Sequence, residues 1–161
     1  MIDPRTRALL QEAVRRANLS LLNYVGDAFP WTTAEGGAAL YELRRIVAED
    51  REAAAALGRF LARKRIPPPF IGSYPMAFTT INFIGLDYLL PRLVAAQREE
   101  IAALERDRAA ATDAEARAEW DKLLAAKRRG LAALERLTSP GPAPSAPAPT
   151  AVAPHPATAA P

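Results

Sequence analysis

The sequence predicts an all-α protein, a four-helix bundle with a long crossover between the second and third helices. Three observations predict this fold. Apolar residues recur at spacings of three and four over four long stretches, which is the period of an amphipathic helix. Proline and glycine gather between the stretches and in the C-terminal tail. The chain has 161 residues, half of them apolar, which is enough for one hydrophobic core.

The first helix is expected from Pro4 to about Ala28. Asp3 is a good N-cap, and Pro4 suits the first helical position because its missing N–H is not needed there. Pro30 breaks the pattern. Six residues at alternating spacings of four and three form the apolar seam: Leu10, Val14, Ala17, Leu21, Tyr24 and Ala28.

The second helix is expected to open with a capping box of Thr32 and Glu35. Its inward face carries Ala39, Leu43, Ile46, Ala53, Leu57 and Phe60. It should end in the basic run at 63–65, where cations suit the negative end of the helix dipole. The stretch 66–75 contains three successive prolines and a glycine, so it is expected to be a long connection.

The third helix is expected to start at 73–75 and to be apolar almost all round until Pro91, which should kink it. Val94, Ile101 and Leu104 then restore a single apolar face. A membrane span is not expected, because Asn82, Asp87 and Pro91 would be costly in lipid.

The fourth helix is expected to begin at a second capping box, Thr112 and Glu115. Its seam is Ala116, Trp120, Leu123, Lys127, Gly130, Leu134 and Leu137. The bundle therefore covers residues 1–137. Residues 138–161 are rich in proline and alanine and carry no charge pattern, so we expect a disordered tail.

Composition excludes several chemistries. The chain has no cysteine, and its single histidine, His155, lies in the tail, so disulfides, thiolate sites and Ser-His-Asp catalysis are excluded from the bundle. The net charge of +3 comes from basic residues interspersed with acids, which argues against nucleic-acid binding. The N-terminus lacks a secretory pattern, so a cytoplasmic location is expected.

Two helical hairpins joined by a long crossover resemble the ferritin-like superfamily. The stretch "EDREAAAALGRFLARKRIPPP", residues 49–69, is similar to the second helix of that superfamily, where E-x-x-H-A precedes a proline-containing loop. The resemblance implies a histidine at position 52 or 53, after Glu49 or Asp50. Those positions hold Glu52 and Ala53.

The fourth helix departs from the same pattern. The E-x-x-H repeat would need histidine three residues after Glu115 or Glu119, and the chain has Ala118 and Lys122 there. We therefore expect a degenerate member that has not retained the metal ligands, with no catalytic, cofactor or metal site. The alternative is a carboxylate-based metal-binding protein or metal-dependent enzyme that uses acids of the second helix, such as Glu49 and Glu52.

A buried polar cluster is predicted around Asp50, which lies about 40° from Ile46 on a helical wheel and so faces the core. Lys127 occupies a seam position near the middle of the fourth helix. An unpaired charge at such depth would be very costly, so we expect Asp50 and Lys127 to form an ion pair, with hydrogen bonds from Gln97 and Tyr24. A competing hypothesis treats Asp50 as a surviving metal ligand.

The expected function is a non-catalytic, metal-free interaction or structural module that associates with itself or with a protein partner. Self-association is expected through the apolar third helix, where Phe83, Leu86 and Leu90 fall away from the line of Ile81 and Tyr88. Whether a small ligand binds near Asn82 or Tyr88, and whether the protein is an enzyme, stays open at this level.

Overall fold

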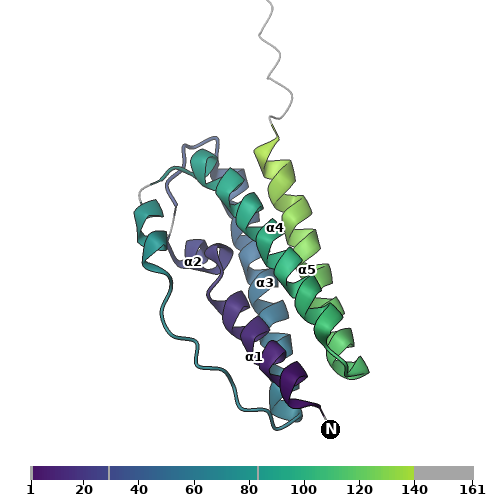
Figure 1. Ribbon diagram of the computed structural model, residues 1–161. Coiled ribbons are helices and arrows are strands. Elements are labelled where there is room, and N and C mark those ends of the chain that lie inside the picture. The colour runs from purple at the N-terminus through teal and green to yellow at the C-terminus, as the bar shows by residue number, and fades with distance from the viewer. Residues whose placement is uncertain (1, 29, 83, 140–161) are drawn as a thin grey trace, which may run out of the picture.

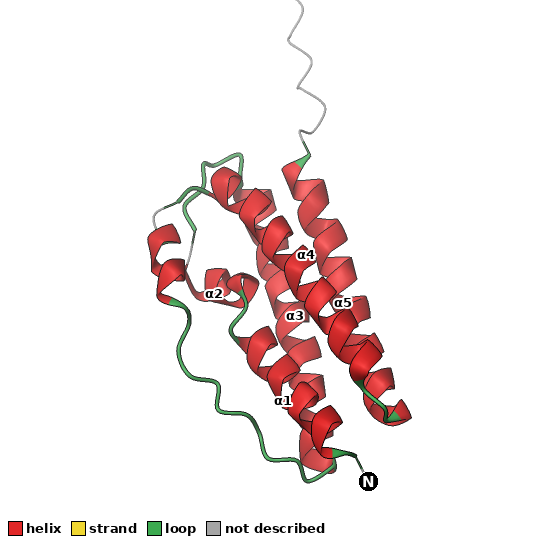
Figure 2. Cartoon of the chain, in the orientation of Figure 1, coloured by secondary structure: helices red, strands yellow, loops and turns green. Residues whose placement is uncertain are grey.

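The computed structural model describes residues 2–28, 30–82 and 84–139. Within these ranges every regular element is helical, which confirms the predicted all-α class (Figure 2). The elements are α1 (Pro4–Asn18), α2 (Leu21–Ala28), α3 (Gly37–Arg63), the 3₁₀-helix η1 (Met76–Ile81), α4 (Leu86–Ala110) and α5 (Ala114–Thr138). The predicted tail lies almost entirely outside the described residues.

The helices pack side by side as a bundle (Figure 1). The chain leaves the N-terminus through α1 and α2 and returns through α3, whose last turn lies near the N-terminus. The connection 64–85 then runs back along the whole bundle and carries η1 (Figure 1). As a result α4 runs in the same direction as α3, and α5 returns antiparallel to both. No helix in the described part of the chain is long and apolar enough to cross a membrane.

The core consists of two apolar clusters stacked along the bundle. One cluster, at the end near the N-terminus, includes Leu10, Leu57, Phe60, Leu104 and Trp120. The other, toward the starts of α3 and α4, includes Leu43, Ile46, Leu89, Leu93 and Leu134. Each of α3, α4 and α5 crosses from one cluster to the other near its middle. The polar residues described below lie at these crossings.

The first predicted helix is wrong in one respect, because it is broken into α1 and α2 at Leu19 and Ser20. Polar side chains on both sides of the break replace helical backbone bonds. Asn18 Nδ2 donates to the Val14 carbonyl, and Ser20 Oγ accepts the N–H of Asn23. Such local side-chain bonds compete with the regular helix ladder. The N-cap of α1 is as predicted, since Asp3 accepts the Thr6 N–H.

Neither predicted capping box forms. Helix α3 begins only at Gly37, and its N-cap, Gly36, offers no side-chain bond. Helix α5 is capped by Asp113, which accepts the Ala116 N–H at 2.8 Å. Thr112 instead donates its hydroxyl to Asp3 at 2.7 Å and so ties the start of α1 to the turn between α4 and α5.

The third predicted helix begins later than expected. Residues 76–81 form a 3₁₀-helix and α4 starts at Leu86, with Pro91 inside it. The sequence prediction assumed one continuous helix through this segment. Because η1 and α4 are separate elements, the predicted outward face is wrong. Leu86 and Leu90 are buried, whereas Tyr88 is 78% exposed. Phe83 lies outside the described residues. The predicted self-association surface on this helix therefore does not exist in the form expected.

Candidate functional site

Three charged side chains meet in the middle of the bundle, and we call Asp50 of α3, Glu100 of α4 and Lys127 of α5 the buried triad. Lys127 Nζ donates to Asp50 Oδ2 at 2.8 Å and lies 2.9 Å from Glu100 Oε1. The three residues are 5%, 8% and 0% exposed, respectively. The triad separates the two apolar clusters of the core as a single polar layer.

Helical periodicity brings each member inward. Asp50 lies between Ile46 and Leu57 on the buried face of α3, and Lys127 lies between Leu123 and Leu134 on that of α5. Gly130, three residues after Lys127, lies against α3, since a Cβ there would come into contact with Ile46 Cγ2 at 3.4 Å. The geometry expected of Asp50 and Lys127 from the sequence is thus present.

Glu100 is the member that the sequence prediction missed. It follows the buried Gln97 by three residues and precedes the buried Leu104 by four, which is the spacing of one helix face. This spacing is a signal that could have identified Glu100. However, Glu99 beside it is exposed, and two adjacent acids are typical of a solvent-exposed helix face. Only the rotation of α4 against α3 and α5 places Glu100 inside.

Of the two residues predicted to support the ion pair, Gln97 lies beside the triad and Tyr24 does not. Gln97 is buried and donates to the backbone carbonyl of Lys127 at 3.2 Å, so it joins α4 to α5 at the triad without touching either carboxylate. Tyr24 does not reach the triad. Its hydroxyl donates to Asn82, and its ring packs edge-on against Tyr74. The break between α1 and α2 displaces Tyr24 from the seam position that an unbroken helix would give it.

Burial and the charges of its neighbours shift the pKa values of Glu100 and Lys127. Burial raises the pKa of Glu100, and the attraction of Lys127 only partly opposes this effect. Burial also acts to lower the pKa of Lys127, but Glu100 and Asp50 together outweigh it, so that pKa is raised. With all three groups ionised the triad carries one net negative charge. Glu100 Oε1 is deeply buried and forms an ion pair with the Lys127 ammonium at 2.9 Å.

The triad has a chemical consequence for cation binding. The Lys127 ammonium lies between the two carboxylates, which is where a metal ion would have to sit to use them both. An added cation at a few ångströms from this ammonium would be repelled. Within the described ranges no three histidine, aspartate or glutamate side chains gather in a way that could hold a metal ion.

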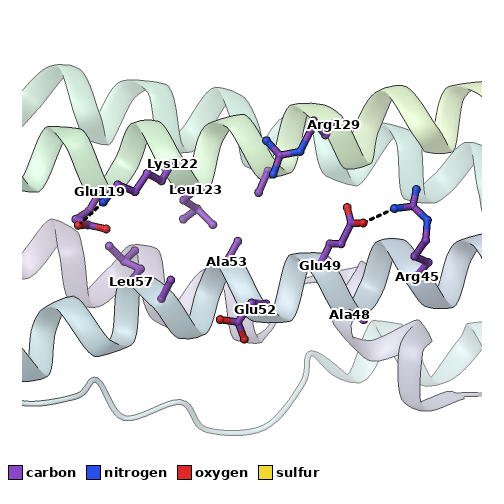
Figure 3. Close-up of a pocket in the computed structure, with 12 residues that line it drawn as sticks. Arg45, Ala48, Glu49, Glu52, Ala53, Leu57, Glu119, Lys122, Leu123 and Arg129 are labelled. Carbon is purple, nitrogen blue, oxygen red and sulfur yellow. Dashed lines mark hydrogen bonds and ion pairs between the residues drawn. The ribbon is translucent and has the colours of Figure 1, made fainter.

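A groove with a volume of about 620 Å³ runs between α3 and α5, and we call it the α3–α5 groove. Figure 3 shows Ala53, Leu57 and Leu123 facing the space between the two helices. Charged residues of both signs border it: Arg45, Glu49, Glu52, Glu119, Lys122 and Arg129. Two of the bordering contacts are ion pairs, Arg45 with Glu49 and Lys122 with Glu119 (Figure 3).

A second cleft, which we call the α4 cleft, has a volume of about 410 Å³ and lies where α1 breaks into α2, facing η1 and α4. Its walls are largely apolar and include Leu19, Leu22, Phe78, Leu93 and Ala96. Gln97 and Glu100 also line it, so the cleft borders the α4 member of the buried triad.

Comparison with known proteins gives no match, whether with family models, with curated proteins or with solved structures. The candidate function therefore rests on the triad, the groove and the cleft.

Proposed function

We propose that this protein is a non-catalytic, metal-free helical bundle of ferritin-like layout that acts as an interaction module and assembles with a second copy of itself. The layout is supported by the long connection 64–85 and by the common direction of α3 and α4 (Figure 1). In such bundles the inward-facing acids hold metal ions. In this protein the positive charge beside the inward-facing acids is the ammonium of Lys127.

The observation that carries the metal-free part is the position of Lys127 Nζ, 2.8 Å from Asp50 and 2.9 Å from Glu100. The ammonium offsets carboxylate charge in a layer whose three side chains are buried. A buried charge needs a partner of opposite charge. If a metal ion bound the two carboxylates, the Lys127 ammonium would lose its partners. The competing hypothesis, in which Asp50 is a metal ligand, would require Lys127 to leave the core.

Metal analysis of purified protein tests this part. We expect substoichiometric iron, manganese and zinc, and no rise in melting temperature when divalent metal is added to the wild type. The control is Asp50→Asn, which should respond to metal in the same way as the wild type. One metal ion per chain, lost in Asp50→Asn, would refute the metal-free proposal.

The α3–α5 groove supports self-assembly as the mode of interaction. Its floor of alanine and leucine allows another helix to approach closely, and its charged border carries both signs. In a two-fold symmetric dimer the same surface of both copies forms the interface. A groove bordered by both positive and negative side chains can therefore pair opposite charges with a second copy of itself. Arg129 and Glu52 lie on opposite helices of the groove, which lets each face its opposite charge on the second copy.

Substitutions of paired alanines test the groove. Ala56→Trp and Ala126→Trp each place an indole in it, whereas Ala55→Trp and Ala125→Trp place one on the neighbouring exposed positions. We expect the wild type and the two controls to sediment as dimers across the micromolar range and the two groove variants as monomers. Thermal melts verify that all four variants fold. A monomeric wild type, or equal behaviour of groove and control variants, would contradict self-assembly through this groove.

A further inference from the structure

We propose that the start of the connection after α3 is a ligand for another protein, one whose binding groove is lined by aromatic side chains and bordered by acidic ones. We call residues 65–70 the proline segment. It consists of Arg65, Ile66, Pro67, Pro68, Pro69 and Phe70. The α3–α5 groove is lined by residues of α3 and α5, so the proline segment is separate from the surface proposed for self-assembly.

The backbone of the proline segment is restricted by its sequence. Proline fixes its own φ, and a residue before proline is kept in the extended or polyproline II region. Residues 66–68 each precede a proline. Polyproline II has three residues per turn, so residues 66 and 69 share one face. The burial agrees with this period, because Ile66 is buried and Pro69 is half-buried, whereas the other positions are exposed: Pro67, Pro68 and Phe70.

The outward side of the proline segment is apolar. The side chain of Phe70 is 89% exposed, and Pro67 and Pro68 are exposed beside it. Grooves lined by aromatic side chains bind proline-rich segments of this conformation, in part because the segment is ordered before it binds. Two proline rings and one phenyl ring are therefore available to such a groove.

The bundle holds the connection on both sides of this apolar surface. Ile66 is buried, and Gln11 Nε2 of α1 donates to the Pro67 carbonyl at 2.8 Å. Further along the connection, the Tyr74 ring packs on the Tyr24 ring of α2, with centroids 5.1 Å apart. A segment that is already held in its binding conformation loses less entropy when a partner binds.

Arg65 provides the charge that favours an acidic partner. It is exposed and follows the end of α3 with a φ of 56°, in the left-handed region. The Ile66 N–H donates to the Leu61 carbonyl at 2.9 Å, and the Arg65 N–H donates to the Ala62 carbonyl at 3.0 Å. This is the pattern of a helix end that usually has glycine in the left-handed position. Arginine is less favourable there for folding, which supports a role of its guanidinium in binding.

The C-terminal residues 140–161 are also rich in proline, but their composition fits such a groove less well. They include no Phe, Trp, Tyr, Lys or Arg. An aromatic groove with an acidic border would find neither an aromatic ring nor a positive charge there. The proline segment offers both, which favours it over the tail as the ligand.

Surface plasmon resonance with an immobilised SH3 domain and an immobilised WW domain tests the proposal. Both kinds of domain bind proline-rich segments in aromatic-lined grooves, and the two probes are chosen with acidic side chains beside the groove. We expect the full-length wild type to bind at least one of them, more weakly as salt rises. No binding to either domain would overturn the proposal.

Proline substitutions locate the ligand. The full-length variant with Pro67→Ala and Pro68→Ala should bind the same domain at least about tenfold more weakly than the wild type. The matched control carries Pro144→Ala and Pro147→Ala in the tail and should bind like the wild type. Loss of binding in the tail variant, or full affinity in the 67–68 variant, would contradict the assignment. Sedimentation of the 67–68 variant separates this result from the proposed self-assembly, which it should leave unchanged.

Two further substitutions separate binding from folding. Arg65→Gly should raise the melting temperature, because glycine accepts positive φ, and should reduce both the affinity for the domain and its salt dependence. Phe70→Ser should weaken binding at least about tenfold, whereas Tyr88→Ser, at another exposed aromatic residue, should leave it unchanged. Full affinity in folded Phe70→Ser, or unchanged salt dependence in Arg65→Gly, would refute the proposed contacts.

Discussion

Lys127 Nζ on α5 lies 2.9 Å from Glu100 Oε1 on α4, so the ammonium that the sequence pairs with Asp50 serves two carboxylates. Three helices consequently share one polar layer between two apolar clusters. Removing any one member leaves a different imbalance of charge in the core, and this sets the expected order of the variants below.

Lys127→Met should be the most destabilising single change in the triad. It leaves Asp50 and Glu100 buried together without a cation, and breaking a buried ion pair from one side costs about 3–5 kcal/mol. Asp50→Ala should cost less, because Glu100 still accompanies the ammonium. Urea unfolding at neutral pH measures both. A smaller loss for Lys127→Met than for Asp50→Ala would contradict a shared layer.

Replacing Asp50 and Lys127 together by leucine and methionine should not restore full stability, because it strands Glu100. The triple variant that also carries Glu100→Leu should recover most of the loss, since apolar residues of similar volume commonly replace buried ions without cost. The same urea experiment applies. Full recovery in the double variant would show that Glu100 has no energetic part in the layer.

Stability should depend on pH through Glu100. Burial holds its pKa above the ordinary value of 4.5, so above that pH the folded chain retains a proton that the unfolded chain releases. Folding is then favoured less as pH rises through this window. The raised pKa of Lys127 acts only above its ordinary 10.5, where its contribution is lost as pH rises further.

Glu100→Gln removes the first dependence. We expect the unfolding free energy of the variant, relative to wild type, to increase as pH rises above 4.5, the ordinary pKa of the group, as measured by urea unfolding at each pH. Glu105→Gln, on the exposed side of α4, should run parallel to wild type. A wild-type curve that rises with pH faster than that of Glu100→Gln would mean that the sign of the Glu100 pKa shift is wrong.

Two glycines should respond in opposite directions to alanine. At Gly58 in α3 a Cβ would meet no atom within 4 Å, so Gly58→Ala should stabilise by roughly 0.5–1 kcal/mol through helix propensity. At Gly26 in α2 a Cβ would lie 2.5 Å from Val47 Cγ1 on α3, so Gly26→Ala should destabilise by about 1–3 kcal/mol. Thermal unfolding of both variants checks the contrast, which equal shifts would contradict.

Removal of residues 140–161 should leave the melting temperature unchanged. These residues include no Asp, Glu, Lys, Arg, Phe, Trp or Tyr, and they have too little large apolar surface to offset the entropy of ordering. A chain that ends at Ser139 keeps the whole of α5. Calorimetry of the two chains side by side measures the difference, and a drop of several degrees would show that the tail docks.

The sequence by itself determined the helical class, the N-cap at Asp3, the long connection after α3 and the inward positions of Asp50 and Lys127. These follow from interactions within a few residues, namely capping bonds, proline restrictions and the period of an uninterrupted helix. Such local rules hold wherever one helix continues without a break.

Only the tertiary structure decided the membership of Glu100, the exclusion of Tyr24 and the outward position of Tyr88. The helical period predicts the buried face only up to the next interruption. The breaks between α1 and α2 and between η1 and α4 therefore change which residues face inward in the helix that follows. At the edge of a helix face, burial depends on how the helix is rotated against its neighbours. Glu99 and Glu100 differ by one position in the chain, and the packing of α4 on α5 alone determines which of the two enters the core.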